Sequence, residues 1–259
     1  LNIFNTSCVL ASPDITTDAG YLRIESIVAH EYFHNFSGNR VTCRDWFQLS
    51  LKEGFTVFRD SQFSADMNSA GVKRVEDVSF LRTHQFAEDA GPMAHPVRPY
   101  SFIEISNFYT LTVYEKGAEV VRMLHTLLGH DLFIAGAKYY FAKHDGQAVT
   151  CDDFVSAMEQ VSEKDLTQFR RWYEQSGTPD LIIDDQYDPT ARRVTLTVTQ
   201  NNGQNPDGAS KPPLHLPVAI GLVVKGHSHT FEEGGSTRLL EVTEAKQVFE
   251  IDNVEDKPV

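Results

Sequence analysis

Hydrophobic and polar positions follow two different patterns along this chain, and the pattern changes near residue 178. Before that point, apolar side chains recur at the spacing of a helix. The clearest case covers residues 46–67, whose apolar face includes Phe47, Leu51, Phe55 and Phe58. After that point, apolar and polar residues alternate, most regularly over residues 193–200, as in a half-buried strand. The two patterns predict a helical region followed by a region of strands.

Capping and turn residues indicate where the individual elements begin and end. We predict a helix within residues 68–91 and further helices over 114–129 and 131–143. Thr150 is a suitable N-cap for another helix. Strands are predicted over residues 193–200, 216–224 and 247–251, with Gly, Asn and Pro clusters between them. The predicted fold class is α+β and multidomain, with a mainly helical domain over residues 1–178 and a small β-sandwich over 179–259.

Composition narrows the classes of function. The formal net charge of −13 argues against a nucleic-acid partner, because no basic stripe offsets it. No apolar run approaches the length of a membrane-spanning helix, so we expect no membrane partner. The three cysteines are widely spaced and odd in number, which predicts reduced thiols and a cytoplasmic protein. His227 and His229 could be read as a metal-binding pair, but the neighbouring Gly226 favours a hairpin turn.

The chemistry of the chain is concentrated in the run His30-Glu31-Tyr32-Phe33-His34. If this run is helical, the two histidines lie on one face, about 6 Å apart along the axis, and both imidazoles can reach one ion. A catalytic zinc site has three protein ligands, and Glu53 is the natural third. Glu31, beside the first ligand, is then placed to act as the general base. The alternative is a surface helix with an ordinary histidine pair.

Two carboxylates on the following helix support the zinc interpretation. Glu53 stands among aromatic residues, where a buried carboxylate is costly unless a cation neutralises it. Zinc would do so, although Lys52 or an arginine could do so too. Asp60 follows two helical turns later on the same face and is a candidate acceptor for the N–H of a ligand histidine. A solvated side chain, or a partner of Arg59, is the alternative for Asp60.

Several segments together resemble the M1 family of zinc aminopeptidases, which are gluzincin metalloproteases. These segments are the HEXXH run with Glu53 following after 18 intervening residues, then Gly38-Asn39-Arg40-Val41-Thr42, Lys52-Glu53-Gly54 and Tyr114-Glu115-Lys116-Gly117-Ala118. The resemblance extends from residue 1 to at least 179, and more loosely beyond. It implies a hydrolase with a thermolysin-like catalytic domain, one zinc ion per chain, and peptide substrates with a free N-terminus.

The same resemblance assigns roles to two tyrosines that the residues alone would not reveal. Tyr114 is expected to donate a hydrogen bond to the oxyanion that develops on the scissile carbonyl, whereas its apolar surroundings alone would favour a core tyrosine. Tyr109 is expected to form a wall of the pocket for the first side chain of the substrate.

One family segment has no counterpart in this chain. The Gly-Ala-Met-Glu-Asn segment, whose glutamate holds the α-amine of the substrate, is expected upstream of Leu1. The N-terminal β-domain and helical C-terminal domain of the family are also expected outside it, so we interpret the chain as a fragment. Two alternatives to an aminopeptidase remain: a related gluzincin that hydrolyses epoxides or cleaves internal peptide bonds, and an isolated zinc-binding module without activity.

Overall fold

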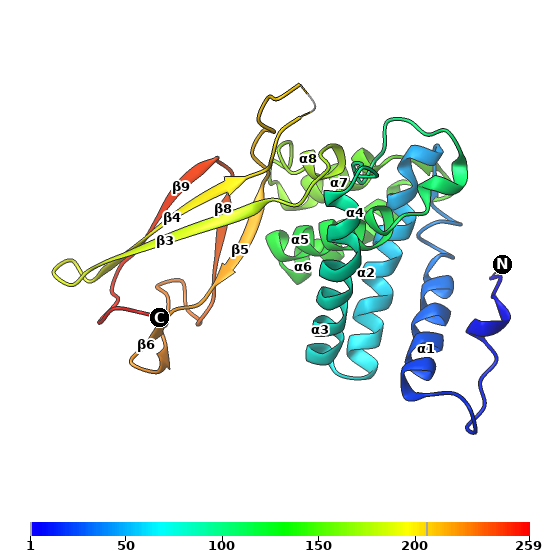
Figure 1. Ribbon diagram of the computed structural model, residues 1–259, viewed down its shortest axis with the longest axis horizontal. Coiled ribbons are helices and arrows are strands. Elements are labelled where there is room, and N and C mark those ends of the chain that lie inside the picture. The colour runs from blue at the N-terminus through cyan, green and yellow to red at the C-terminus, as the bar shows by residue number, and fades with distance from the viewer. Residues whose placement is uncertain (1, 206) are drawn as a thin grey trace. The chain divides into compact units, whose positions relative to one another are not determined.

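The computed structural model describes residues 2–205 and 207–259, which fold into two compact units (Figure 1). The first unit contains the residues up to Leu166 together with Trp172–Ser176. The second contains Thr167–Arg171 and Gly177–Val259. Among the described residues, no helix is both long enough and apolar enough to cross a membrane.

The first unit is a bundle of helices around a central helix, α2. Its helices are α1 (Asp18–Phe33), α2 (Leu49–Met67), α3 (Ala70–Phe80), α4 (Phe86–Ala90), α5 (Gly117–Leu128), α6 (His130–Lys143) and α7 (Cys151–Ser162), with the short α8 (Arg171–Glu174) near its end. Strands β1 (Thr42–Cys43) and β2 (Ala148–Val149) form a parallel pair. In Figure 1, α1, α2 and α3 lie side by side.

Helices α1, α3 and α7 begin at residues whose side chains cap them. Thr17 accepts a hydrogen bond from the backbone N–H of Gly20 at the start of α1. The prediction that Thr150 caps a helix is confirmed, because Thr150 and Asp153 form a reciprocal capping box at the start of α7. These caps satisfy N–H groups that have no partner within their own helix.

Two π-helical turns interrupt the regular helices. Leu81–Gln85 separates α3 from α4, so the helix predicted within residues 68–91 is divided into three pieces. Thr112–Lys116 leads directly into α5. A π-turn has a wider hydrogen-bonding pattern than the α-helix, and such turns are frequent at functional sites. The second turn carries Tyr114.

Two glycines set the distance between α2 and the start of α5. A Cβ atom added to Gly54 would lie 2.8 Å from the carbonyl carbon of Gly117, and one added to Gly117 would lie 2.1 Å from Ser50 Oγ. Ser50 Oγ also donates a hydrogen bond of 2.8 Å to the carbonyl oxygen of Val113. The small residues therefore allow the Tyr114 segment to lie directly against α2.

The second unit is built from antiparallel strands. Strands β3 (Asp180–Asp188), β4 (Arg193–Asn201) and β9 (Lys246–Ile251) form a sheet in the order β3-β4-β9. Strand β5 (Leu216–Ile220) pairs with β8 (Arg238–Val242). The core of this unit contains Val194, Leu196, Leu222, Phe231, Leu240, Ile251 and Val254. The alternation predicted for residues 193–200 matches the buried positions of β4.

The pair His227 and His229 belongs to a hairpin rather than to a cluster of ligands. Strands β6 (Val223–Val224) and β7 (His227–Ser228) pair in antiparallel fashion around Lys225 and Gly226, which both have positive φ. The predicted hairpin is confirmed.

Candidate active site

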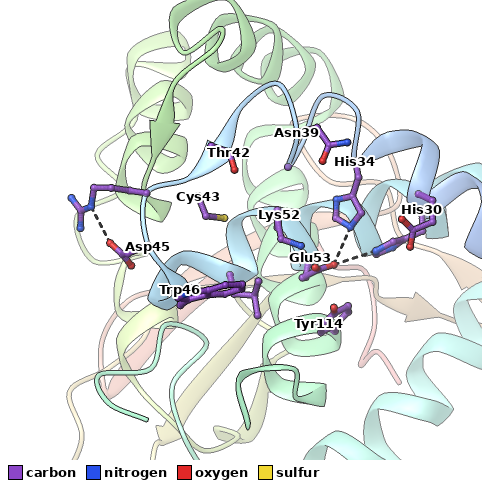
Figure 2. Close-up of a pocket in the computed structure, with 14 residues that line it drawn as sticks. His30, His34, Asn39, Thr42, Cys43, Asp45, Trp46, Lys52, Glu53 and Tyr114 are labelled. Carbon is purple, nitrogen blue, oxygen red and sulfur yellow. Dashed lines mark hydrogen bonds and ion pairs between the residues drawn. The ribbon is translucent and has the colours of Figure 1, made fainter. Parts of the chain in front are cut away.

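Helices α1 and α2 bring the three predicted ligands together (Figure 2). His30 lies in the last turn of α1, His34 is its C-terminal cap, and Glu53 lies on α2. Glu53 Oε2 lies 3.2 Å from His30 Nε2 and 3.1 Å from His34 Nε2. The three ligand atoms all lie within 4.8 Å of one another. The side chains of His30, His34 and Glu53 are only 15%, 12% and 4% exposed.

The other nitrogen of each imidazole has a partner of its own. His34 Nδ1 lies 2.9 Å from the carbonyl oxygen of Ser37, which can only accept a hydrogen bond. His30 Nδ1 lies 2.7 Å from Asp60 Oδ2, which acts as the acceptor when the carboxylate is ionised. In the neutral rings the proton is therefore on Nδ1, and the lone pairs of both Nε2 atoms face Glu53. This is the tautomer that a metal-binding histidine requires.

The turn after α1 is shaped to hold His34. Gly38 adopts a φ of 142°, and a Cβ atom there would lie 2.9 Å from His34 Nδ1. Only glycine adopts such a conformation without strain, so Gly38 lets the carbonyl of Ser37 approach the ring. Thr56, on α2, donates to the same carbonyl oxygen at 3.2 Å and fixes the turn against that helix.

Glu53 and the two imidazoles need a positive charge, from protons or from a cation, between them. Burial alone would raise the pKa of Glu53, but hydrogen bonds from His30 and His34 in their protonated forms and the charge of Lys52 hold it well below its usual value. Burial alone would lower the pKa of His30, but Asp60 and Glu53 raise it to about 9. Two nitrogen lone pairs that face a carboxylate oxygen need protons or a metal ion between them. The donor set thus fits a divalent metal.

Lys52 contacts the second oxygen of Glu53. The sequence had left open whether this lysine neutralises the carboxylate. Its ammonium group pairs with Oε1, while Oε2 faces the histidines. Lys52 thus neutralises part of the charge of Glu53 through Oε1, while Oε2 stays directed at the two imidazoles. Asp60 pairs with His30 and not with Arg59, whose guanidinium lies 4.2 Å above the ring of Phe33.

A cavity of about 710 Å³ opens in front of the ligands. His30, Glu31, His34, Glu53 and Tyr114 are among the residues that line it. The rest of the lining comes from the loop after α1 and the start of α2, and no sequence motif had indicated these residues for substrate contact. They are Gly38, Asn39, Thr42, Cys43, Arg44, Asp45, Trp46, Leu49 and Lys52. Figure 2 shows Tyr114 across the cavity from the Thr42–Cys43 wall.

The surroundings of Tyr114 favour the protonated form of its hydroxyl. Burial and the nearby charge of Glu53 raise the pKa of Tyr114 well above its usual value. Its ring stacks on that of His30 with the centroids 6.4 Å apart. A neutral hydroxyl beside the ligand cluster is a hydrogen-bond donor, as an oxyanion-stabilising group must be.

Tyr109 lies beside the cavity and is not among the residues that line it. Tyr109 is 49% exposed, and its ring centroid lies 6.4 Å from that of Tyr114 and 6.5 Å from that of Trp46. Its contact with a substrate side chain stays a prediction.

With this geometry in place, comparison with known proteins identifies the class. Residues 1–173 match the model of the peptidase family M1 domain, and residues 177–259 match a domain of unknown function described as having an Ig-like fold. The chain belongs to peptidase family M1. The predicted fold class, a helical catalytic domain followed by a β-sandwich module, is confirmed.

Individual relatives are similar over the whole chain. It is 57% identical over 262 aligned positions to aminopeptidase N of Escherichia coli (strain K12) and 56% identical to aminopeptidase N of Haemophilus influenzae. All of the chain is covered in both cases, but only 30% of the length of either relative. A crystal structure of Legionella pneumophila aminopeptidase A in complex with aspartic acid matches with a TM-score of 0.85 and 33% identity, covering 98% of this chain and 27% of that one.

Proposed function

We propose that this chain carries the catalytic centre of a zinc aminopeptidase, which removes the N-terminal residue from peptides by hydrolysis. The observation that carries the proposal is the convergence of His30 Nε2 and His34 Nε2 on Glu53 Oε2, at 3.2 and 3.1 Å. Membership of family M1 supports it, as do relatives that are all named aminopeptidases.

The ligand set suits one zinc ion per chain. Two imidazoles and one carboxylate would hold it and leave a position open, as catalytic zinc sites require. When bound, zinc supplies a lowered pKa for water and polarises a carbonyl group. Asp60, which accepts from His30 Nδ1, would keep the ring oriented and its Nε2 atom unprotonated.

Glu31 is the proposed general base. Its half-buried carboxylate lines the cavity next to His30, so it is in position to take a proton from the water that attacks the scissile carbonyl. The same carboxyl group then delivers that proton to the leaving nitrogen as the C–N bond breaks. One water is consumed, and the products are a free amino acid and a peptide shorter by one residue.

Tyr114 is the proposed donor to the oxyanion. Its neutral hydroxyl would stabilise the negative charge that appears on the carbonyl oxygen in the transition state more than it stabilises the substrate. Tyr109 is proposed to contact the first side chain of the substrate from the edge of the cavity, beside Trp46.

The proposed substrates are peptides with a free N-terminus, and the group that binds the α-amine is proposed to lie outside this chain. The chain spans 30% of the length of its curated relatives. We therefore expect the amine-binding glutamate, an N-terminal β-domain and a helical C-terminal domain in a longer protein. Within the chain, residues 1–178 are proposed as the catalytic domain and 179–259 as the β-sandwich.

The cellular location is proposed to be the cytoplasm. All three cysteines have free thiols in the structure. This includes Cys43, which is only half-buried. Such thiols suit a reducing compartment.

Substitution of Glu31 tests the proposal most sharply. Glu31→Gln should keep the zinc and lower kcat on an amino-acid p-nitroanilide by roughly 10²–10⁴-fold, because the amide cannot accept the proton. Glu25→Gln, on the same helix and outside the cavity lining, is the matched control and should keep full activity. Full activity in Glu31→Gln would remove Glu31 as the base.

A second experiment separates the aminopeptidase from the other gluzincin reactions. We expect the protein that contains this chain to hydrolyse a free peptide and not its N-acetylated form. Equal hydrolysis of the two would favour an enzyme that cleaves internal bonds, and turnover of an epoxide alone would favour an epoxide hydrolase.

A further inference from the structure

The segment that carries Tyr114 is held by hydrogen bonds and an ion pair on the side opposite the cavity. Thr112 and Lys116 are four residues apart and therefore lie on one face of the helical turn. Tyr114 is two residues from each, and roughly half a turn separates it from both. Contacts to Thr112 and Lys116 thus fix the direction of Tyr114 without touching it.

These contacts come from three residues around α4, Gln85, Glu88 and Asp89, which we call the 85–89 bracket. Glu88 Oε1 accepts hydrogen bonds from the backbone N–H of Thr112 at 2.8 Å and from its Oγ1 at 2.5 Å. Gln85 Nε2 donates to Thr112 Oγ1 at 3.2 Å. Asp89 Oδ2 accepts from Lys116 Nζ at 2.6 Å.

Four of the five residues in these contacts are buried, and the fifth, Glu88, is half-buried. Thr112 is 0% exposed and Gln85 1%, and the side chains of Asp89 and Lys116 are 0% and 8% exposed. A buried ion pair adds little net stability compared with apolar residues of the same volume. Polar groups concentrated behind one catalytic side chain are therefore better explained by orientation than by stability.

Glu88 has the most direct effect on orientation. The first N–H groups of a helix have no partner within that helix, and a carboxylate at this end is favoured by the helix dipole. By accepting from both the N–H and the hydroxyl of Thr112, Glu88 determines where the turn begins. The start of the turn in turn determines the direction of Tyr114, two residues later.

We propose that Glu88 is a positioning residue for Tyr114, acting through Thr112, and that the 85–89 bracket holds the Tyr114 hydroxyl at the catalytic cavity. The proposal rests on the proposed function, in which Tyr114 donates to the oxyanion. A misplacement of about 1 Å in a catalytic group can cost up to 10²-fold in rate. Loss of the Glu88 contacts should therefore lower turnover and leave substrate binding nearly unchanged.

The test compares four single variants and one double variant of the zinc-loaded protein that contains this chain. Glu88→Ala should lower kcat about tenfold or more on an amino-acid p-nitroanilide and change KM less than about twofold. Glu88→Gln should recover most of the lost kcat, because its amide oxygen still accepts from Thr112. Glu119→Ala is the matched control: the Glu119 side chain is 21% exposed against 20% for Glu88, and it pairs with Arg74 and Arg122. It should keep full kcat.

The fourth variant, Tyr114→Phe, shows whether Glu88 acts through the tyrosine. In the Tyr114→Phe background, Glu88→Ala should lower kcat no further, because the group that it positions is gone. Amide hydrogen exchange should also become faster at Thr112 in Glu88→Ala and stay unchanged in Glu119→Ala.

The outcomes separate the two proposals. If Tyr114→Phe is impaired while Glu88→Ala keeps full kcat, the positioning role is wrong and the role of Tyr114 stands. If Glu88→Ala costs the same factor in both backgrounds, it acts elsewhere and the positioning role is again wrong. If Tyr114→Phe keeps full kcat, the oxyanion role is wrong and the positioning role falls with it.

Discussion

Helix α2 and strand β4 are the central elements of their two units, and they bury different kinds of side chain. The buried positions of β4 are three aliphatic residues and Gln200, alternating with half-buried ones. More than half of the buried positions of α2 are polar, namely Ser50, Glu53, Thr56, Asp60, Ser61 and Ser64. Burial of polar groups costs free energy unless they are hydrogen-bonded. The difference indicates that β4 serves stability, whereas α2 gives up apolar burial to build a site.

The two histidine pairs, one in each unit, differ in a similar way. His30 and His34 have a partner on Nδ1 and a carboxylate facing Nε2. His227 lies exposed on a two-residue strand next to a turn. Spacing alone makes both pairs candidates for metal ligands, but only the first has the surrounding acceptors that fix a tautomer.

Loss of the Tyr114 hydroxyl should give a large effect, second only to Glu31→Gln among the variants that leave the proposed metal ligands intact. Tyr114→Phe is expected to lower kcat by roughly 10²–10³-fold, the usual cost of one oxyanion donor, with a small change in KM. Steady-state kinetics measures both. A large rise in KM with unchanged kcat would mean that Tyr114 binds substrate and transition state equally.

Removal of the Asp60 charge tests whether buried polarity on α2 supports the ligands. Asp60→Asn is expected to weaken zinc binding by roughly 10–100-fold, because His30 loses its charged acceptor. Competition with a chelator measures the affinity. Val198→Ala on β4 is the contrasting variant: it should lower the free energy of unfolding and leave zinc affinity unchanged. Equal zinc affinity in Asp60→Asn and the unsubstituted protein would contradict the comparison.

The close approach of α2 and α5 can be tested with two glycine substitutions. Gly54→Ala is expected to lower the free energy of unfolding by about 1–3 kcal/mol, since its Cβ atom would collide with the backbone of Gly117. Gly71→Ala on α3 has open space around it and should instead stabilise by roughly 0.5–1 kcal/mol. Denaturant unfolding of both variants measures the difference, and stabilisation by Gly54→Ala would refute the packing argument.

The smallest expected effect concerns Glu115 and pH. Burial and the nearby charges of Asp60 and Asp77 raise its pKa from 4.5 to about 7. Between these two values the folded state holds a proton that the unfolded state has released, so Glu115 lowers stability as pH rises and its penalty is complete above pH 7. The full shift would correspond to about 3 kcal/mol, but Glu115 is half-buried and solvent screens part of its charge. We therefore expect the neutral Glu115→Gln to raise the free energy of unfolding by roughly 1–2 kcal/mol at pH 8 and to leave it unchanged at pH 4. Thermal unfolding at the two pH values measures this, and a constant difference would contradict the assigned pKa.

The sequence was most informative where the chemistry is local. The i,i+4 histidine pair and the two-turn step from Glu53 to Asp60 are set by helix geometry, and the structure brings these residues together. The approach of Tyr114 depends on contacts such as Ser50 to Val113, 63 residues apart, which no local pattern encodes. Only the family resemblance indicated that tyrosine, and the bracket behind it had no sequence signal.

Strands β3 and β8 were not predicted from the sequence, and β3 shows one reason. Asp184 and Asp185 interrupt its apolar pattern, and most of the strand is exposed. Its pairing with β4 supplies the order that its own sequence does not.

Zinc content tests the central claim most directly. After dialysis, elemental analysis should find one zinc ion per chain in the unsubstituted protein and none in His34→Ala. His229→Ala, in the hairpin of the second unit, should keep its zinc. Zinc that survives in His34→Ala, or is lost in His229→Ala, would contradict the assignment of the metal to the His30, His34 and Glu53 cluster.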